Sequence, residues 1–375
     1  MNRAAGIGLV GAGRFGAFCI DAFDDLPGAR VVAVMDPAKA RAEAIAPPGA
    51  ATYDNLGALI DDHAVDIVHI CTPPYLHGPI ARRSAARGKH VFVEKPLATT
   101  LYDAQAAVDA ARRSGVQLSI DYVLRHHPLH QLAIAVTRSA ALGGLQHFAL
   151  ENFASSENLP PHHWFWDPTL SGGIHVEHGV HFFDLAIAHA GRDPDAVSGG
   201  SQARSDGRVD RVSALVRFGD TLTATFYHSF NRTAASERTT IRLAFERGHA
   251  TIDGWIPTRL HIEGTISADA ASSLHALFGD ELHTARRPSA RDGRRVRIAA
   301  TIKRPDRQGE YRLAIRAGMS ELVGAIRHGR PLTVTPDDAV RSLETALRAS
   351  DASVHRSGAD PSARAARRSP RTSST

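Results

Sequence analysis

The chain has 375 residues, of which 43% are hydrophobic and 22% charged; this is enough apolar material for two ordinary cores and excludes a chain disordered throughout. The formal net charge is +5, but no basic patch interleaved with aromatic residues accompanies it, so we expect no nucleic-acid partner. No apolar run approaches the roughly 18 residues of a membrane span, and the N-terminus enters a strand pattern rather than a leader, so we expect no membrane association.

The first 122 residues alternate short apolar runs with amphipathic segments. This alternation is typical of a doubly wound parallel sheet with helices on both faces. The predicted strands are 7–10, 30–35, 67–71, 90–93 and 117–120. The predicted helices are 15–23, 39–46, 56–62, 76–87 and 101–113. We therefore predict an α/β fold with an N-terminal dinucleotide-binding Rossmann domain over residues 1–122.

A glycine-rich loop follows the first predicted strand and opens the first helix. Its predicted cofactor-binding residues are Gly11, Gly13, Arg14, Phe15 and Gly16. The first glycine permits a tight turn, the second lets the backbone approach a pyrophosphate, and the third lets helix and strand pack closely. The helix N-terminus then presents free N–H groups to the phosphates. Asp36 ends the second predicted strand, where a carboxylate accepts from a ribose hydroxyl and repels a 2′-phosphate, so we expect NAD rather than NADP.

The fourth strand of this domain ends in Glu94-Lys95-Pro96. A lysine at this edge of a parallel sheet lies where a bound nicotinamide is expected. Its fixed ammonium group can polarise a hydroxyl or carbonyl while hydride moves. The alternative for Lys95 is a structural ion pair at the strand end.

After residue 122 the pattern changes to alternating and β-branched segments. We predict an α+β substrate and oligomerisation domain over residues 123–355, with an open, largely antiparallel sheet. The predicted strands are 146–152, 211–218, 221–228, 240–245 and 250–253. The predicted helices are 130–140, 176–189, 311–327 and 336–348, the last packing back toward the first domain. Residues 267–307 are expected to form a loop-rich insertion, and the basic residues 356–375 a disordered tail.

Several of these segments together resemble the glucose–fructose oxidoreductase / inositol dehydrogenase / MocA family of NAD(P)-dependent oxidoreductases. The resemblance covers roughly residues 6 to 350. The matching pieces are residues 11–16, 71–77, 88–97, Arg125 with Pro128, and 172–184. The resemblance implies a Rossmann domain followed by a domain whose open sheet serves substrate binding and subunit contact. It also implies that Thr72, Pro73 and His77 line the cofactor.

The resemblance further implies that Glu94 and Lys95 flank the nicotinamide. Pro96 in the family commonly follows a cis peptide bond, which would direct Lys95 into the cleft. Arg125, in the segment that follows the first domain, is assigned to the substrate pocket.

A histidine-rich segment, residues 171–184, supplies the second set of predicted site residues. By position in the family pattern, His181 is the general acid/base and Asp184 the final acid, and Glu177 stands where aspartate is usual. This last substitution is a departure, because the additional methylene pushes the carboxylate outward. Independently of the family, oxidation of an alcohol needs a base for the hydroxyl proton, and histidine suits that task. On a helix Glu177, His178, His181 and Asp184 would share one face.

Two alternatives concern this segment. His178 is assigned to the substrate pocket, although a buried structural role is the simpler interpretation of His175 and His178. A metal site would draw on His162, His163, His175, Glu177, His178 and His181. No H-E-x-x-H or C-x-x-C spacing is present, so we expect no metal. Trp164 and Trp166 are predicted to stack on a sugar-like ring, with ordinary core packing as the alternative.

The leading hypothesis is a dehydrogenase that transfers hydride between nicotinamide and a secondary alcohol of a sugar, polyol or related cyclic substrate. In this hypothesis Lys95 polarises the hydroxyl or carbonyl group, His181 moves the hydroxyl proton, and Glu177 or Asp184 orients the reacting groups. The alternatives are a redox-neutral enzyme that uses NAD transiently for elimination, epimerisation or glycoside cleavage, and a non-catalytic NAD(H)-binding regulator. We expect a small-molecule substrate and a homo-oligomer, dimer or tetramer, formed through the C-terminal sheet. Cys19 and Cys71 are expected to be small core residues, which favours a reducing cytoplasm.

Overall fold

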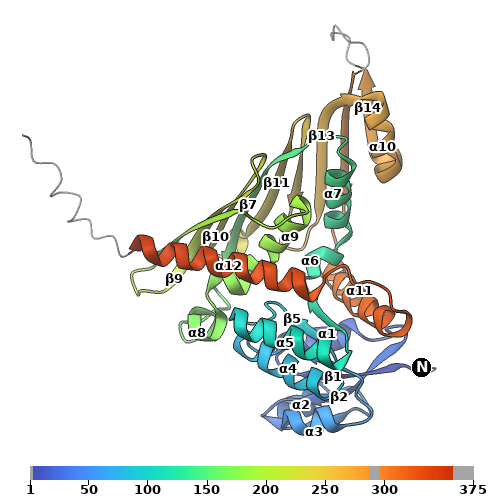
Figure 1. The fold of residues 1–375 in the computed structure, drawn as a ribbon, viewed down its shortest axis with the longest axis vertical. Coiled ribbons are helices and arrows are strands. Elements are labelled where there is room, and N and C mark those ends of the chain that lie inside the picture. Colours follow the sequence, from blue (N-terminus) through green and yellow to red (C-terminus); the bar gives the residue numbers. More distant parts are fainter. Residues whose placement is uncertain (1–2, 287–294, 358–375) are drawn as a thin grey trace, which may run out of the picture.

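The computed structural model describes residues 3–286 and 295–357 of the chain. Each of its two domains is built around one sheet, and the long axis of the molecule runs through both (Figure 1). Within these residues no helix is both long and apolar enough to cross a membrane.

The first sheet has six parallel strands among the described residues. In spatial order they are β3 (Ala51–Tyr53), β2 (Ala29–Met35), β1 (Ala5–Val10), β4 (Ile67–Ile70), β5 (His90–Glu94) and β6 (Leu118–Asp121). The helices of this domain are α1 (Arg14–Ala22), α2 (Lys39–Ile45), α3 (Leu56–Asp61), α4 (His77–Ala86) and α5 (Leu101–Ser114), with a short 3₁₀ turn η1 (Pro74–Leu76). This order is that of a Rossmann fold, with its switch point between β1 and β4, so the prediction is confirmed.

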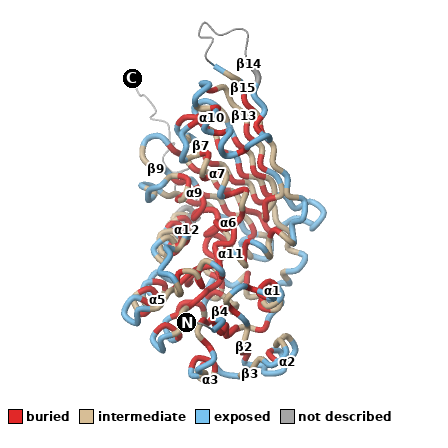
Figure 2. Tube along the Cα trace, turned by 90° about the vertical axis from the view of Figure 1, so that its right-hand side faces the viewer, coloured by how far each residue is buried: buried red, intermediate tan, exposed pale blue. Residues whose placement is uncertain are grey.

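The strands of the first sheet are covered on both faces, which explains their continuous apolar runs. Every residue of β1 and of β4 is buried. Figure 2 shows the buried residues following the strands through both domains. The strand β3 was not predicted, because three half-buried residues give too short a pattern to recognise.

The chain enters the second domain through α6 (Val123–His126) and α7 (Pro128–Ser139). Within the described residues the second sheet has nine strands. In spatial order these are β14 (Leu282–Arg286), β15 (Arg295–Lys303), β13 (Arg259–Ser267), β12 (Gly248–Asp253), β11 (Arg238–Phe245), β7 (Leu145–Ser155), β10 (Leu222–Arg232), β9 (Val209–Phe218) and β8 (Ala196–Ala203). Only β7 and β10 pair in parallel in this sheet as described, so the predicted largely antiparallel sheet is confirmed.

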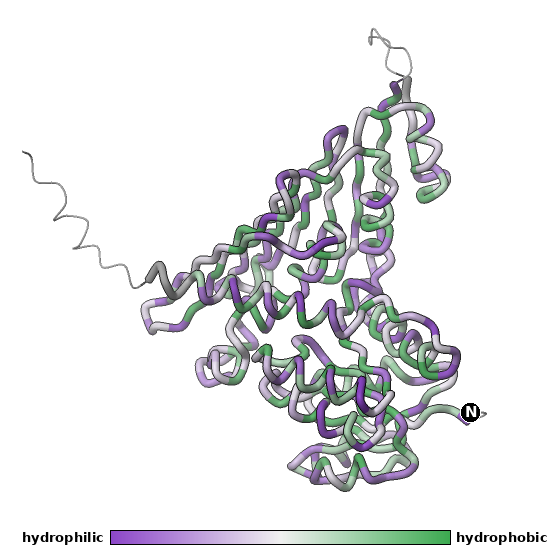
Figure 3. The backbone as a smooth tube through the Cα atoms, viewed as in Figure 1, coloured by the Kyte–Doolittle hydropathy of each residue, from purple (hydrophilic) through white to green (hydrophobic). Residues whose placement is uncertain are grey.

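One face of the second sheet packs against helices, among them α7, α9 (Val180–Ala190) and α10 (Ala268–Phe278). Alternate residues of the strands are therefore buried, as in β9, and hydrophobic and hydrophilic residues alternate along these strands in Figure 3. The other face has half-buried and exposed side chains such as Glu151, which contacts Arg238 and Arg242. The association of chains through this face stays a prediction.

The expectation of a loop-rich insertion over residues 267–307 is wrong. This stretch contains α10, the turn η5 (Gly279–Glu281), β14 and β15. Ser267 caps α10 by accepting from the Ala270 N–H, and Ala271, Leu274 and Phe278 form its buried stripe. The strands β8 and β13 were also missed: β8 is rich in glycine, serine and glutamine, which are weak strand formers.

Two helix predictions need correction. The predicted helix over residues 176–189 is divided: residues His175–Gly179 form a π-helical turn, and α9 begins at Val180. Turns of this kind often occur at functional sites. The last helix, α12 (Pro336–Ser357), extends past the predicted end at residue 348 and includes the first two residues of the predicted tail. Residues 358–375 of that tail lie outside the described residues.

The last two helices connect the domains. The 22-residue helix α11 (Arg307–His328) packs against α1, β6 and α6 beside the first sheet (Figure 1). Arg327 donates to the carbonyl oxygens of Arg3 and Gly28 at 2.8 and 2.7 Å. The helix α12 packs mainly on β8 and α9, and its first turn reaches the first domain through an ion pair between Asp337 and Arg112.

Candidate active site

The glycine loop between β1 and α1 has the geometry of a phosphate-binding turn. Gly11 has φ +104°, and a Cβ there would lie 2.6 Å from the Cys71 carbonyl oxygen. A Cβ on Gly16 would lie 2.2 Å from the Gly11 carbonyl oxygen, whereas one on Gly13 would meet nothing within 4 Å. No side chain caps α1, so its first N–H groups are available to an anion. The loop therefore fits a pyrophosphate at Gly13.

The side chains of Arg14 and Phe15 in this loop have different surroundings. Arg14 is exposed. The ring of Phe15 lies 6.0 Å from that of Phe18 and 6.1 Å from that of Tyr311 on α11, by ring centroids. The ring of Phe15 thus packs the loop against α11. Only the backbone of Phe15 is then available to a cofactor.

The carboxylate of Asp36 lies beside the glycine loop. Its Oδ2 accepts from the Ala12 N–H at 3.0 Å, and its Oδ1 accepts from the Ala38 N–H at the same distance. Asp36 is 8% exposed. A carboxylate has lone pairs for further donors beyond these two, so this group both orders the loop and is placed to accept from a ribose hydroxyl.

The loops after β4 and β5 are joined through one histidine. His77 Nδ1 lies 2.7 Å from the Pro96 carbonyl oxygen, and its Nε2 lies 2.7 Å from the Thr72 carbonyl oxygen. Burial lowers the pKa of His77, and its two backbone partners oppose that shift. The Lys95–Pro96 peptide bond is cis, as the family resemblance implies. Pro73 precedes the η1 turn, so the predicted residues of both loops meet at the carboxyl edge of the sheet.

Lys95 and Glu177 form an ion pair between the two domains. Lys95 Nζ lies 2.8 Å from Glu177 Oε1 and 2.7 Å from the Glu177 carbonyl oxygen. Both side chains are largely buried, with 15% and 13% of their surface exposed. Burial raises the pKa of Glu177, but Lys95 and His178 outweigh it, and the net shift is downward. The pair places a fixed positive charge where the two domains meet.

His181 lies next to this pair, in a cluster of aromatic and imidazole rings. Its centroid is 4.7 Å from Trp255 and 6.2 Å from His178, and His178 is 5.5 Å from His228 on β10. Neither ring nitrogen of His181 has a hydrogen-bond partner among the described residues. Burial first, then Lys95 and the two neighbouring histidines, hold the pKa of His181 well below its usual value. The shift favours the neutral imidazole, which carries a lone pair on one ring nitrogen.

Asp184, three residues after His181 on α9, forms a second buried pair with Arg125. Arg125 Nη1 is 3.1 Å from Asp184 Oδ1, and Arg125 also donates to the Thr333 carbonyl oxygen at 2.9 Å. The two side chains are 9% and 1% exposed. Burial raises the pKa of Asp184 to about 6, although Arg125 opposes the shift. Arg125, predicted to contact substrate, is thus engaged in a link between α6, α9 and the segment before α12.

Trp164 and Trp166 lie in the 3₁₀ turn η2 (Trp164–Trp166), just before α8 (Pro168–Ser171). Trp166 Nε1 donates to the Leu159 carbonyl oxygen at 3.0 Å, and the guanidinium groups of Arg204 and Arg208 lie 5.0 and 5.3 Å from its ring. Both tryptophans pack against a small cluster around Phe165. These contacts favour packing for Trp166, the alternative left open from the sequence.

The side chain of Glu94 lies apart from the Lys95–Glu177 pair. Its Oε1 is 3.7 Å from His69 Nε2. Burial raises the pKa of Glu94 well above its usual value, and also that of Asp121, with which Glu94 shares a hydrogen bond. The side chains of Glu94 and Lys95 thus have different partners. That both flank the nicotinamide stays a prediction.

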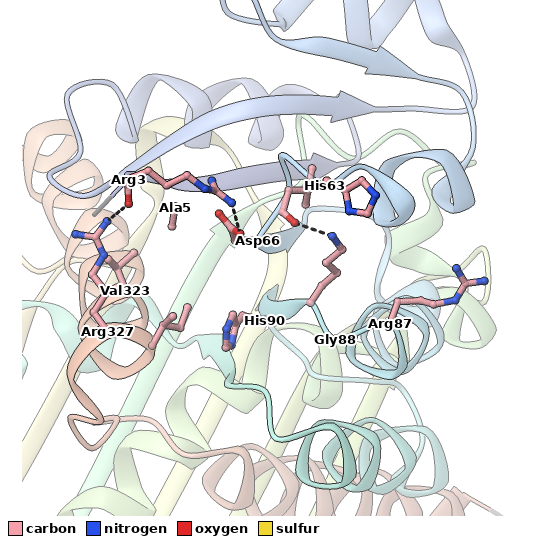
Figure 4. Close-up of a pocket in the computed structure, with 12 residues that line it drawn as sticks. Arg3, Ala5, His63, Asp66, Arg87, Gly88, His90, Val323 and Arg327 are labelled. Atoms are coloured by element: carbon pink, nitrogen blue, oxygen red, sulfur yellow. Dashed lines mark hydrogen bonds and ion pairs between the residues drawn. The ribbon is translucent and has the colours of Figure 1, made fainter. Parts of the chain in front are cut away.

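A separate cavity of about 180 Å³ lies at the opposite edge of the first sheet (Figure 4). It is lined by residues at the amino ends of the strands, including Ala5, His90 and Asp66, and Arg3 pairs with Asp66 at 2.7 Å. Open α/β sheets bind their ligands at the carboxyl ends of the strands. This cavity is therefore not the predicted cofactor site.

Two residues of the ring cluster, Trp255 and His228, were not predicted from the sequence. Trp255 lies in the turn between β12 and β13, and its ring is 5.0 Å from that of His178. Both lie far along the chain from His181 and belong to no motif. A tryptophan directly after a predicted strand end at Asp253-Gly254 was the one available signal.

Two family models match the chain. One is described as an oxidoreductase family with an NAD-binding Rossmann fold and matches residues 5–122; the other is the GFO/IDH/MocA C-terminal domain and matches residues 130–251. Among curated proteins, scyllo-inositol 2-dehydrogenase (NAD(+)) of Bacillus subtilis is 25% identical over 362 residues, 94% of each chain. The 1,5-anhydro-D-fructose reductase of Ensifer adhaerens is 30% identical over 238 residues, which cover 61% of this chain and 70% of the relative.

Solved structures show the same fold. A levoglucosan dehydrogenase in complex with NADH and levoglucosan superposes with a TM-score of 0.75 at 19% identity, covering 94% of this chain and 98% of that one. The likeness extends over both domains.

Proposed function

Because the chain belongs to the glucose–fructose oxidoreductase / inositol dehydrogenase / MocA family of NAD-binding oxidoreductases, we propose that it oxidises a secondary alcohol of a sugar, polyol or related cyclic substrate with NAD as the hydride acceptor. The relatives support this class: they are named for an inositol and for an anhydro sugar. The substrate is a small molecule bound between the two domains.

The contact between Lys95 and Glu177 carries this proposal, together with nearby His181, whose ring nitrogens have no hydrogen-bond partner among the described residues. A bound nicotinamide supplies the acceptor for the hydride that leaves the alcohol carbon. Lys95 stabilises the negative charge that develops on the alcohol oxygen. His181 accepts the hydroxyl proton, for which its neutral form is required. Glu177 holds the ammonium group of Lys95 in place.

The preference for NAD over NADP is proposed from Asp36. Its carboxylate lies beside the turn that would hold the pyrophosphate, where it accepts from a ribose hydroxyl and repels a phosphate. Lys39, three residues later, is 54% exposed and 3.9 Å from Glu43. Lys39 is thus drawn toward a neighbouring carboxylate, and this weakens it as a partner for a 2′-phosphate.

The test is NADH formation with NAD and a panel of sugars, inositols and anhydro sugars, with NADP run in parallel. We expect at least one member of the panel to give NADH, and NAD to be preferred. Conversion of a substrate to product without net NADH would replace this proposal with the redox-neutral mechanism. Tight NADH binding with no conversion across the panel would favour a regulatory protein.

A further inference from the structure

Four potential metal ligands meet inside the first domain, and one of them, Glu94, directly precedes Lys95. They are Cys19 on α1, His69 on β4, Cys71 directly after β4, and Glu94 at the end of β5. One ligand atom from each lies within 4.8 Å of the others. Cys71 Sγ is 3.3 Å from His69 Nε2, which is 3.7 Å from Glu94 Oε1. Two sulfurs, one imidazole nitrogen and one carboxylate oxygen thus face one point.

The fold brings these residues together for simple reasons. Cys71 directly follows β4 and stands two positions after His69, so in extended backbone the two side chains lie on the same face of the sheet. In the neighbouring strand β5, Phe92 is the register partner of His69, which places Glu94 on that same face. Cys19 approaches from α1, which packs closely on the sheet at Gly16. The ligand set therefore depends on two strands and one helix of the Rossmann core.

The imidazole of His69 is held by neighbours on two sides. Its ring centroid is 5.2 Å from that of Phe23 and 5.1 Å from that of Phe92. His69 and Cys19 are fully buried, and Glu94 is 8% exposed. A ring fixed in this way loses little further freedom when it binds a metal, so the cluster is partly preorganised.

One polar atom of the cluster, Glu94 Oε1, is buried and has no hydrogen-bond partner among the described residues. A buried polar atom without a partner is costly. A divalent cation would bind this oxygen together with the two sulfurs and the imidazole.

We propose that Cys19, His69, Cys71 and Glu94 bind a tetrahedral divalent metal ion, with zinc as the best fit. Zinc accepts this mixture of sulfur, nitrogen and oxygen ligands, at about 2.3 Å to sulfur and roughly 2.0–2.2 Å to nitrogen and oxygen. Tetrahedral geometry then spaces the ligand atoms roughly 3.3–3.8 Å apart. The present separations of up to 4.8 Å need only a small contraction. All four positions come from the protein, so the site is closed and structural.

The position of this site suggests what the metal stabilises. The carbonyl oxygen of Cys71 lies against Gly11, the first residue of the phosphate-binding turn. Coordination of Cys71 would join this turn and α1 to the ends of β4 and β5. Metal binding at the cluster is therefore expected to raise the thermal stability of the full chain.

The test uses the full-length chain, purified without a metal-binding tag under reducing conditions and loaded with Co²⁺ as a spectroscopic substitute for zinc. We expect one bound ion per chain, with thiolate-to-cobalt charge-transfer bands and the intense visible bands of tetrahedral cobalt. Cys19→Ser and Cys71→Ser should each weaken cobalt binding by more than about 100-fold, since even outer partners of metal ligands are worth about 10- to 100-fold. The control is His261→Asn, in the second sheet, which should bind as the parent does.

The parent chain keeps the proposal falsifiable even if the serine variants do not fold. Cobalt bound without thiolate bands, or no stoichiometric cobalt in the reduced parent chain, would overturn it. Recovery of Cys19 and Cys71 as a disulfide that forms in air, in a reduced chain that takes up no metal, would replace the metal site with a redox pair. A rise in melting temperature with Zn²⁺ that disappears in Cys71→Ser, with circular dichroism showing a folded variant, would support it.

Discussion

Glu177 presents two oxygen atoms to the same ammonium group: Oε1 at 2.8 Å and its own carbonyl oxygen at 2.7 Å from Lys95 Nζ. The carbonyl belongs to the π-helical turn before α9, and Lys95 follows the last residue of β5. An ammonium group has three N–H donors. These two contacts leave one donor for a ligand between the domains, as far as the described residues are concerned.

Lys95→Met is expected to lower kcat by about 10²- to 10³-fold, the effect of removing one donor that stabilises a developing oxyanion. The affinity for NAD should change little, because the phosphate-binding turn is intact. Steady-state kinetics and NAD titration by tryptophan fluorescence measure the two quantities. Lys303→Met, on the exposed surface of β15, is the matched control. Equal turnover in the two variants would remove Lys95 from the mechanism.

Glu177→Gln tests the contact that holds the ammonium group of Lys95 in place, and leaves the charge of Lys95 unchanged. The amide oxygen and the unchanged carbonyl can still accept from Lys95, but one contact loses its ionic character. Such a contact is worth roughly 1 kcal/mol more when it is charged, so we expect kcat to fall about fivefold. Exposed Glu157→Gln is the control, and kcat at saturating NAD is the readout. A loss as large as that of Lys95→Met would mean that Glu177 itself takes part in proton transfer.

His181→Asn should lower kcat by about 10²- to 10⁴-fold at neutral pH, the usual contribution of a general base. The pKa of His181 is held well below its usual value by burial and by Lys95, so the parent enzyme should keep its activity as the pH falls through the ordinary histidine range. A pH profile of kcat/KM checks this. Loss of activity with the pKa of a solvent-exposed histidine would contradict the assignment.

Asp36→Asn should reduce the preference for NAD over NADP. The amide oxygen can still accept from one N–H of the turn, but it neither attracts two ribose hydroxyls as strongly nor repels a phosphate. We expect the ratio of kcat/KM for the two cofactors to fall at least about tenfold, which corresponds to about 1.4 kcal/mol. Asp280→Asn, exposed in the second domain, should leave the ratio unchanged. An unchanged ratio in Asp36→Asn would mean that other residues select the cofactor.

Stability at acid pH should depend on His189. Burial lowers the pKa of this residue from 6.5 to about 3, and its Nδ1 lies 2.8 Å from Thr137 Oγ1. Between these two pH values the unfolded chain binds the proton and the folded chain does not, so the free energy of unfolding falls as the pH falls below 6.5. In His189→Asn this contribution is absent.

The difference in the free energy of unfolding between the parent and His189→Asn should therefore shrink by about 2 kcal/mol between pH 7.5 and pH 5. Urea unfolding at the two pH values measures it, and the other titrating groups cancel in the comparison. A difference that is constant with pH would show that folded His189 binds its proton as readily as the unfolded chain does.

The first domain could be predicted in detail because its signals are local. Each buried strand is a continuous apolar run, and each helix follows within a short turn, as in the segment from β1 through Gly11 to α1. Less of the second sheet could be predicted, because its strands are long and half-buried and several paired strands lie far apart in the sequence. The pairing of β7 with β10 joins residues such as Phe148 and Ala224, and no local pattern indicates such a partner.

The candidate site also contains residues that lie in local motifs and residues that only the fold brings together. Lys95, Glu177 and His181 belong to motifs that occupy short segments, so each could be named from the sequence; their catalytic roles stay predictions. Trp255 and the four proposed metal ligands depend on contacts between separate elements. No spacing along the chain indicates such a cluster, because its members come from one helix and two strands.

The helix α11 has a consequence for how the protein is made. It covers part of the first domain with residues from near the end of the chain: Gly318 lies against Phe92, and Arg316 donates to the Ala22 carbonyl oxygen. A ribosome that has released the Rossmann strands has not yet released this cover. The apolar surface of the N-terminal domain that α11 covers therefore stays exposed until nearly nine-tenths of the chain has been synthesised. During that interval the exposed surface favours binding by chaperones.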